Sequence, residues 1–262
     1  MRILFVGDVI GRPGRRALAK ILPRVVRQHN VEVTIANGEN VAGGIGITES
    51  TAGELFGCGV DILTGGNHIW DKRDSVAFVS SCDRLVRPAN YPPGTPGVGH
   101  GLFTTRMGNT LGVVNLQGRV FMQAVDCPFR VGATLVEKLL ESTKVVLVDI
   151  HAEASAEKLA LGWHLAGCAS AVVGTHTHVQ TADERILEGH TAYITDVGMT
   201  GPDRSVIGVK TELSLARFLT QRPHRFEVAD GPCTMNAVLL DINEETGAAA
   251  EIERINVQVF EN

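Results

Sequence analysis

The chain of 262 residues has little of what marks several protein classes. Its five cysteines are scattered and form no Cys-x-x-Cys pair, so we expect reduced thiols, with neither a disulfide framework nor a thiolate-rich zinc or iron–sulfur site. No apolar run approaches 18 residues, and the N-terminus leads directly into a strand-like segment. We therefore expect no signal peptide, no membrane helix and a cytoplasmic location.

Aromatic residues make up only 5% of the chain, and the formal net charge is -5. A protein that binds long nucleic acid needs a basic face, so we expect neither that role nor sequence-specific DNA binding. A small phosphorylated substrate is compatible with this charge, because bound metal ions supply local positive charge. The scarce aromatic residues form no visible cluster for binding a nucleobase.

Five segments are aliphatic along their whole length rather than alternating, which is typical of strands buried on both faces. These segments are residues 2–6, 32–36, 60–64, 144–150 and 171–173. Helical patterns follow or separate them at residues 15–28, 48–56, 154–166 and 209–219. Such alternation predicts parallel strand pairs with helical crossovers.

Other segments refine this prediction. A hairpin is expected at 101–105 and 111–116, and the last third is rich in strand-like segments, including 225–228. Pro23 is expected to kink or split its helix. We predict an α/β fold, a two-sheet sandwich flanked by helices, formed by a single domain over 1–262. A small helical insertion near 120–140 is left open.

The ends of the five strands carry side chains that bind metals. Four offer oxygen and three offer imidazole nitrogen: Asp8, Glu39, Asn40, Asn67, His151, His176 and His178. Two cations with about four protein ligands each, sharing one carboxylate, need about this number. Mixed nitrogen and oxygen donors suit iron, manganese or zinc better than magnesium or calcium. An isolated His-x-His would be as compatible with packing or hydrogen bonding as with a metal.

These motifs, in this order, resemble those of a known family. The segments GDVIGRPGR, NGENVAGG, GGNHIWD, the lone His151 and GTHTHVQT are similar to the YmdB-like branch of the calcineurin-like metallophosphoesterases, from residue 1 to about 210. The resemblance implies the calcineurin-like metallophosphoesterase fold. It also implies a dinuclear phosphodiesterase that uses a metal-bound hydroxide, with 2′,3′-cyclic nucleotides as the favoured substrates. The resemblance further implies that His68 is the catalytic proton donor to the leaving oxygen.

The sequence departs from the wider superfamily at several motif positions. The usual Asp-x-His opening is here Asp8-Val9-Ile10, and Ile10 cannot bind a metal. Glu39 stands where the bridging aspartate is usual, and the resemblance implies that Asn40 replaces the missing histidine. An acidic residue often follows the Asn-His pair, but here Asp71 is the nearest acid. The two cations are expected to be iron or manganese, with zinc as the alternative.

Several alternatives stay open. The enzyme could be a phosphomonoesterase, or the chain could be a regulatory RNA-processing partner with a structural metal site. Its substrate could be derived from RNA, and a homo-oligomer is expected. A strand residue, Asp149, could orient a neighbouring group, and Asp196 could lie at the rim of the site, support the ligand residues from behind, or belong to a plain turn.

The start of the first helix has two further interpretations. The glycines of GDVIGRPG suggest a nucleotide-binding loop, but their spacing fits neither G-x-G-x-x-G nor the P-loop pattern. The three arginines there, Arg12, Arg15 and Arg16, could contact substrate phosphate. A solvated helix face is the more common arrangement for such arginines.

Overall fold

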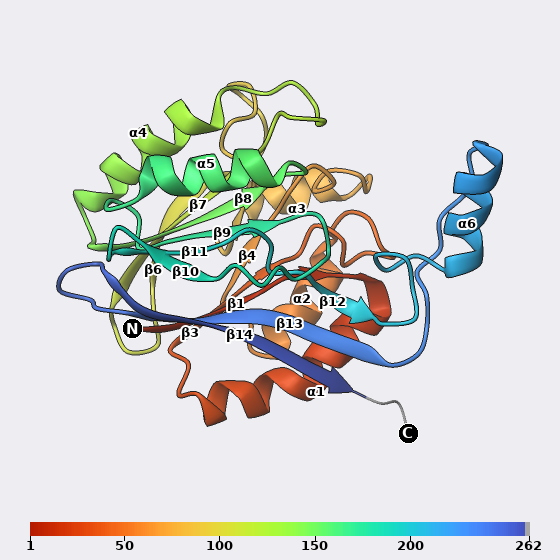
Figure 1. The fold of residues 1–262 in the computed structure, drawn as a ribbon, viewed down its shortest axis with the longest axis horizontal. Helices are drawn as coiled ribbons and strands as arrows, with labels where there is room; N and C mark the ends of the chain where they lie inside the picture. The colour runs from red at the N-terminus through yellow and green to blue at the C-terminus, as the bar shows by residue number, and fades with distance from the viewer. Residues whose placement is uncertain (260–262) are drawn as a thin grey trace.

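Two β-sheets face each other at the centre of the protein (Figure 1). This is a computed structural model that describes residues 1–259, so the last three residues of the predicted domain, 260–262, lie outside the described residues. The eight-stranded sheet has the order β2-β12-β13-β1-β3-β4-β5, with β14 paired to β13. The six-stranded sheet has the order β10-β11-β9-β8-β7-β6.

The eight-stranded sheet is formed by segments from both ends of the chain. Its strands are β1 (Arg2–Val6), β2 (Asp8–Val9), β3 (Val33–Asn37), β4 (Ile62–Thr64), β5 (Leu85–Val86), β12 (Met199–Pro202), β13 (Cys233–Ile242) and β14 (Ala249–Val259). The six-stranded sheet uses the middle of the chain. Its strands are β6 (His100–Thr104), β7 (Thr110–Gln117), β8 (Val145–His151), β9 (Ala171–Thr175), β10 (Arg185–Leu187) and β11 (Thr191–Ile194).

Helices cover the outer faces of both sheets. They are α1 (Gly11–Gln28), α2 (Glu49–Gly57), α3 (Ser75–Ser81), α4 (Pro128–Leu140), α5 (Ser155–Leu165) and α6 (Thr211–Thr220). In Figure 1, α4 and α5 lie over one sheet and α1 lies beyond the other, whereas α6 projects away from the body. The predicted α/β class, with two sheets between helices, is confirmed.

The strand β1 is apolar over residues 3–6 because both of its faces are covered. Ile3 and Phe5 point into the core between the two sheets, whereas Leu4 and Val6 join the core under α1 and α2. All four side chains are fully buried. Because successive strand residues point to opposite faces, a strand covered on both sides has no solvent-facing position for a polar residue.

Two details differ from the sequence-based predictions, and a third had been left open. The helix α1 continues past Pro23. Proline has no backbone N–H, so the carbonyl of Ala19 loses its helical hydrogen bond, but Ala19 and Pro23 both lie on the exposed face, where water can bond that carbonyl. Residues 225–228 form no strand; only Val228 makes an isolated bridge, to Val209. The helix near 120–140 is α4, which packs on the second sheet through Val136 and Leu139. The single-domain organisation stays a prediction.

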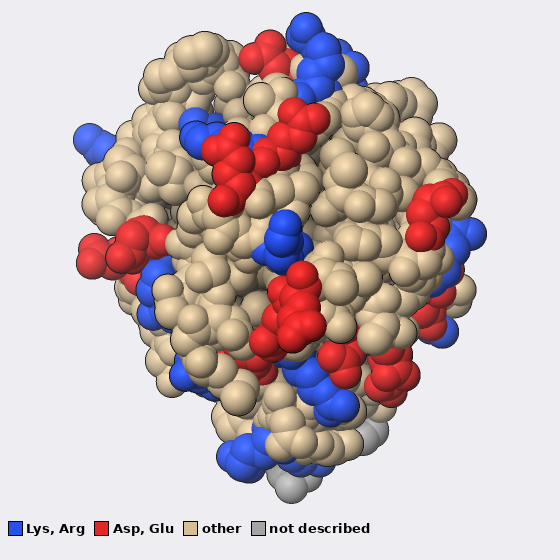
Figure 2. Space-filling view, turned by 90° about the vertical axis from the view of Figure 1, so that its left-hand side faces the viewer, with Lys and Arg blue, Asp and Glu red and all other residues tan. Residues whose placement is uncertain are grey.

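The face turned away from α6 carries charged side chains of both signs. Among the described side chains there, lysines and arginines alternate with acidic residues and form no continuous basic stripe (Figure 2). Within residues 1–259, no helix is both long enough and apolar enough to cross a membrane.

The topology decides where the five predicted strand ends meet. The strands β1, β3 and β4 are parallel neighbours in the first sheet, and β8 and β9 are parallel neighbours in the second. The ends therefore come from two sheets and meet across the sandwich. Gly7, between β1 and β2, lets the backbone approach closely, because a Cβ there would lie 1.9 Å from the carbonyl oxygen of Gly198. This close packing, and not a phosphate loop, accounts for the glycine.

Candidate metal centre

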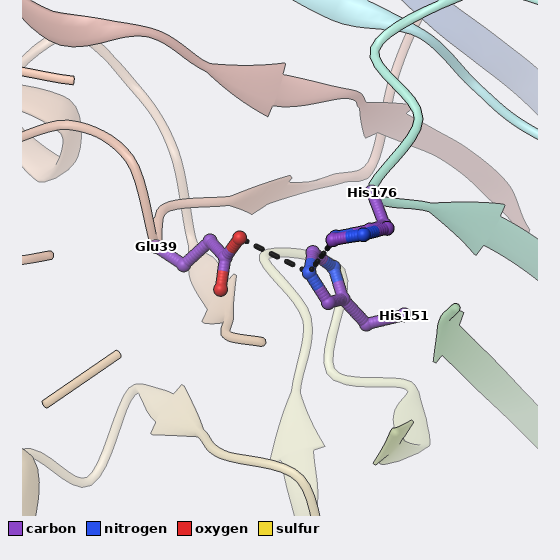
Figure 3. Close-up of side chains that lie close together, drawn as sticks. All are labelled: Glu39, His151 and His176. Carbon is purple, nitrogen blue, oxygen red and sulfur yellow. Dashed lines mark hydrogen bonds and ion pairs between the residues drawn. The ribbon is translucent and has the colours of Figure 1, made fainter. Parts of the chain in front are cut away.

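Three buried or half-buried side chains point toward one another above the strand ends (Figure 3). The Nε2 atom of His151 lies 3.0 Å from Oε1 of Glu39 and 3.0 Å from Nδ1 of His176. These three residues present ligand atoms within 4.8 Å of one another, as the protein ligands of one metal ion do. Glu39 follows β3, His151 ends β8 and His176 follows β9, so the group joins both sheets.

A fourth predicted ligand belongs to the same group. The Oδ1 atom of Asn67, after β4, lies 3.0 Å from Nε2 of His151. That single nitrogen therefore faces an oxygen of Glu39, an oxygen of Asn67 and a nitrogen of His176 at the same distance. One ring nitrogen carries either one proton or one lone pair and cannot satisfy three partners. A cation bound among these atoms would satisfy all of them, so the donor set fits a metal ion.

The other three predicted ligands lie beside this group. The carboxylate of Asp8 is fully buried, and its Oδ1 atom has no hydrogen bond among the described residues. This Oδ1 atom lies 3.7 Å from Nε2 of His178, and the amide nitrogen of Asn40 lies 3.4 Å from the same Nε2 atom. A buried carboxylate oxygen without a hydrogen bond is unfavourable, so the surroundings of this Asp8 oxygen also fit a cation. Turning the side-chain amide of Asn40 by 180° would point its oxygen, instead of its nitrogen, toward that cation.

Two of the histidines are held by their outer nitrogens. Nδ1 of His178 bonds the carbonyl of Ile207 at 2.9 Å, which makes Nδ1 the donor and leaves the lone pair on Nε2. Nδ1 of His151 lies 2.9 Å from the hydroxyl of Thr175, whose own proton goes to Asp149 at 2.8 Å. Metal-binding histidines are commonly oriented in this way. Asp149 thus orients a neighbouring group, as the sequence suggested.

The pKa values of Glu39, His151 and His176 show how strongly the charges of these three side chains interact. Burial alone would raise the pKa of Glu39, but the charge and hydrogen bond of His151 lower it to about 2. Burial would lower the pKa of His151, but Glu39 raises it to about 9. Burial and the charge of His151 lower the pKa of His176 to about 3. The opposite shifts of Glu39 and His151 show that the buried carboxylate is stabilised by positive charge at this place, which a bound metal ion would supply.

Backbone geometry brings the ligands close together. His176 and His178 both have positive φ, 100° and 66°, which non-glycine residues rarely adopt. Gly66 has no side chain because no space exists for one. A Cβ at that position would lie 2.4 Å from both Oε2 of Glu39 and Nε2 of His151.

A buried ion pair holds the residue between the two histidines. Asp196 accepts from the backbone nitrogen of Thr177 at 3.0 Å and from its hydroxyl at 2.8 Å. The same oxygen of Asp196 pairs with the ammonium of Lys158 at 2.6 Å, and both side chains are fully buried. Of the roles left open for Asp196, the structure shows support of the ligand residues from behind. Asp196 is a buried anchor of the His-x-His segment, and Lys158 was not singled out because it belongs to a helical pattern.

His68 differs in orientation from the neighbouring Asn67. Its backbone nitrogen donates to Oε2 of Glu39 at 2.8 Å, while its ring lines the cleft above the centre. The ring nitrogen Nδ1 lies 2.6 Å from a carboxylate oxygen of Asp71, and the side chain is 36% exposed. His68 therefore faces solvent and any bound substrate rather than the ligand group.

The centre lies at the floor of a cleft of about 760 Å³. Glu39, Asn40, His68, His176 and His178 line it on one side. The lining also includes residues that the sequence did not indicate, namely Ile207, Val209, Arg217, Arg225, Phe226 and Val228. Glu153, two residues after His151, also lines the cleft and lies 3.2 Å from Nε2 of His176.

The arginines at the start of α1 are not at the cleft. Arg12 and Arg16 are exposed, and Arg15 pairs with Glu54 at 2.7 Å. Arg15 also donates to the carbonyl of Val41. These contacts agree with a solvated helix face rather than with phosphate binding.

Comparisons with known proteins agree with the geometry. Residues 4–255 match the family described as YmdB-like protein. The chain is 49% identical over 255 residues to a Bacillus subtilis protein named 2′,3′-cyclic-nucleotide 2′-phosphodiesterase, covering 97% of this chain and 96% of that one. A Thermus thermophilus crystal structure of a hypothetical protein superimposes with a TM-score of 0.90 at 44% identity, covering 98% and 99%.

A second solved structure, described as a novel phosphatase from Mycoplasma pneumoniae, has a TM-score of 0.93 at 32% identity, covering 98% of this chain and 93% of that one. The motifs that suggested the resemblance, the family match and the shared fold all lead to the same conclusion. The chain belongs to the YmdB-like family.

Proposed function

We propose that this protein is a metal-dependent phosphodiesterase with a dinuclear centre, and that it hydrolyses 2′,3′-cyclic nucleotides or similar small phosphodiesters. The observation that carries the proposal is the convergence of Glu39, Asn67, His151 and His176 at the floor of an open cleft. The name of the Bacillus subtilis relative supports the substrate class. Small diesters derived from RNA have this chemistry.

The seven ligand-type residues divide into two groups that share one carboxylate. We assign Asn67, His151 and His176 to one cation and Asp8, Asn40 and His178 to the other, with Glu39 between them. The mixture of carboxylate, amide and imidazole favours iron or manganese, with zinc as the alternative. When bound, two cations withdraw charge from the phosphoryl oxygens and lower the pKa of the attacking water.

We assign to His68 the proton transfer to the leaving oxygen. Asp71 accepts the Nδ1 proton of His68, so Nε2, on the opposite side of the ring, is free to hold a proton for the substrate. The backbone nitrogen of His68 donates a hydrogen bond to Glu39, and this bond fixes His68 next to the centre. A general acid of this kind contributes typically about 10²–10⁴-fold to the rate.

Turnover of matched substrates tests the proposed function. Protein reloaded with manganese or iron should hydrolyse 2′,3′-cyclic AMP much faster than the monoester 3′-AMP. Faster release of phosphate from 3′-AMP would make the protein a phosphomonoesterase, the activity that the description of the Mycoplasma pneumoniae structure suggests. Turnover of neither substrate would favour a regulatory role with a structural metal site.

A further inference from the structure

One wall of the cleft, formed by residues 207–209 and 226–228, is joined directly to the proposed metal centre. His178 bonds the carbonyl of Ile207, which begins this wall. Two residues further on, Val209 makes a bridge to Val228, and the nitrogen of Ala229 donates to the carbonyl of Gly208 at 2.9 Å. The segments 207–210 and 226–229 therefore lie side by side next to the centre.

The wall carries an aromatic ring that no core contact of the fold explains. Phe226 lines the cleft and is 43% exposed, although a large apolar side chain is usually removed from water. The guanidinium carbon of Arg217, from α6, lies over the ring at 4.9 Å from its centroid. One face of the ring is therefore backed by a cation, and the ring also borders the open cleft.

We propose that Phe226, backed by Arg217, stacks against the base of a nucleotide whose phosphate lies at the metal centre; this inference rests on the proposed function. A flat base covers the aromatic face and is removed from water with it. A cation on the other face of the ring is attracted by its π electrons and holds the ring in place. Because every nucleobase has a π face, such a platform accepts all four bases.

The dimensions of the cleft agree with an occupant larger than phosphate. Its volume of about 760 Å³ lies in the range of pockets that enclose drug-sized ligands. Besides Phe226, its lining includes the apolar side chains of Ile45, Ile207 and Val228. Lys72 and Arg225 line the cleft together with the acidic Glu153 and Glu227, so the positive charge that attracts the phosphate would come from the bound metal ions.

Two substrates with the same reacting group separate stacking from chemistry. Adenosine 2′,3′-cyclic phosphate carries a base, and glycerol 1,2-cyclic phosphate has a similar five-membered diester without one. In Phe226→Ala we expect kcat/KM for the nucleotide to fall roughly 5- to 150-fold, and to fall far less for the glycerol diester. Phe226→Tyr, which keeps the ring, should restore most of the loss.

A binding measurement and a control complete the test. The affinity for adenosine 3′-phosphate, measured by calorimetry, should fall in Phe226→Ala by a similar factor. Phe218→Ala is the matched control, because Phe218 is 69% exposed on α6 and is not part of the cleft lining. It should leave both substrates and the affinity unchanged.

The outcomes distinguish the two proposals. Equal losses on both substrates in Phe226→Ala, or an unchanged affinity for adenosine 3′-phosphate, would overturn the stacking platform and leave the proposed phosphodiesterase intact. If the wild-type protein turns over neither diester but Phe226→Ala still weakens nucleotide binding, the proposed reaction is wrong and the platform stands.

Discussion

Replacing Lys158 by methionine removes the cation of a fully buried ion pair while keeping most of the side-chain volume. The ammonium of Lys158 lies 2.6 Å from Asp196, and neither side chain is exposed. Removing one partner of such a pair leaves the other charge buried, which lowers the free energy of unfolding by about 3–5 kcal/mol. Three hydrogen bonds remain to Asp196, two from Thr177 and one from Gly198, so we expect the lower end of this range.

Replacing Asp196 by leucine should cost more, about 5 kcal/mol, because it strands the ammonium and also releases Thr177. Thermal unfolding measures both changes. At about 2–4 °C for each kcal/mol, the melting temperature should fall by about 6–12 °C in Lys158→Met and by about 10–20 °C in Asp196→Leu. Arg254→Met is the control, since its pair with Glu184, 2.7 Å long, is partly exposed and contributes at most about 1 kcal/mol.

The double variant Lys158→Met/Asp196→Leu decides whether the two charges act as a pair. Because it strands neither charge, it should be more stable than the sum of the single losses predicts. Simple additivity of the two losses would refute the buried pair. Asp196→Leu should also bind manganese more weakly than Lys158→Met does at a temperature where both are folded, because Asp196 holds the residue between His176 and His178.

Further predictions concern the centre itself. Glu39→Gln should lose more metal than Asn40→Ala, since a shared carboxylate serves two cations and an amide oxygen serves one; equal metal contents would exclude the bridging role. His68→Ala should retain both metals yet lose about 10²–10⁴-fold in diester hydrolysis, and less for a nitrophenolate leaving group, which needs little protonation. A uniform loss over good and poor leaving groups would argue against proton donation. Gly66→Ala should bind little metal, because its Cβ would lie 2.4 Å from atoms of Glu39 and His151; full metal content would contradict that geometry.

The sequence was informative where structure is decided locally. The segments 2–6 and 144–150 are strands because their uniform aliphatic character fits burial on both faces, and Thr48 caps α2 through its own side chain. The convergence of the ligand-type residues was also predictable, because side chains at the ends of parallel strands meet at one edge. Their division between two sheets depended on strand order, which no local pattern records.

Features that depend on tertiary contacts were not predictable in the same way. Lys158 reads as one polar residue in a helix, and only the packing of α5 brings it to Asp196, 38 residues away. The segment RFEV at 225–228 alternates like a strand, yet its apolar side chains face the cleft instead of a sheet. Phe226 becomes a candidate for binding a base only when α6 places Arg217 over it.

Metal content is the most direct test of the central claim, that seven residues at the strand ends hold two cations. Protein purified without chelator, reloaded with manganese or iron and freed of excess metal should contain two ions per chain by elemental analysis. The variant His151→Ala, which removes the nitrogen at the middle of one ligand group, should retain one ion or none. A wild-type protein that retains no stoichiometric transition metal after reloading would contradict the account.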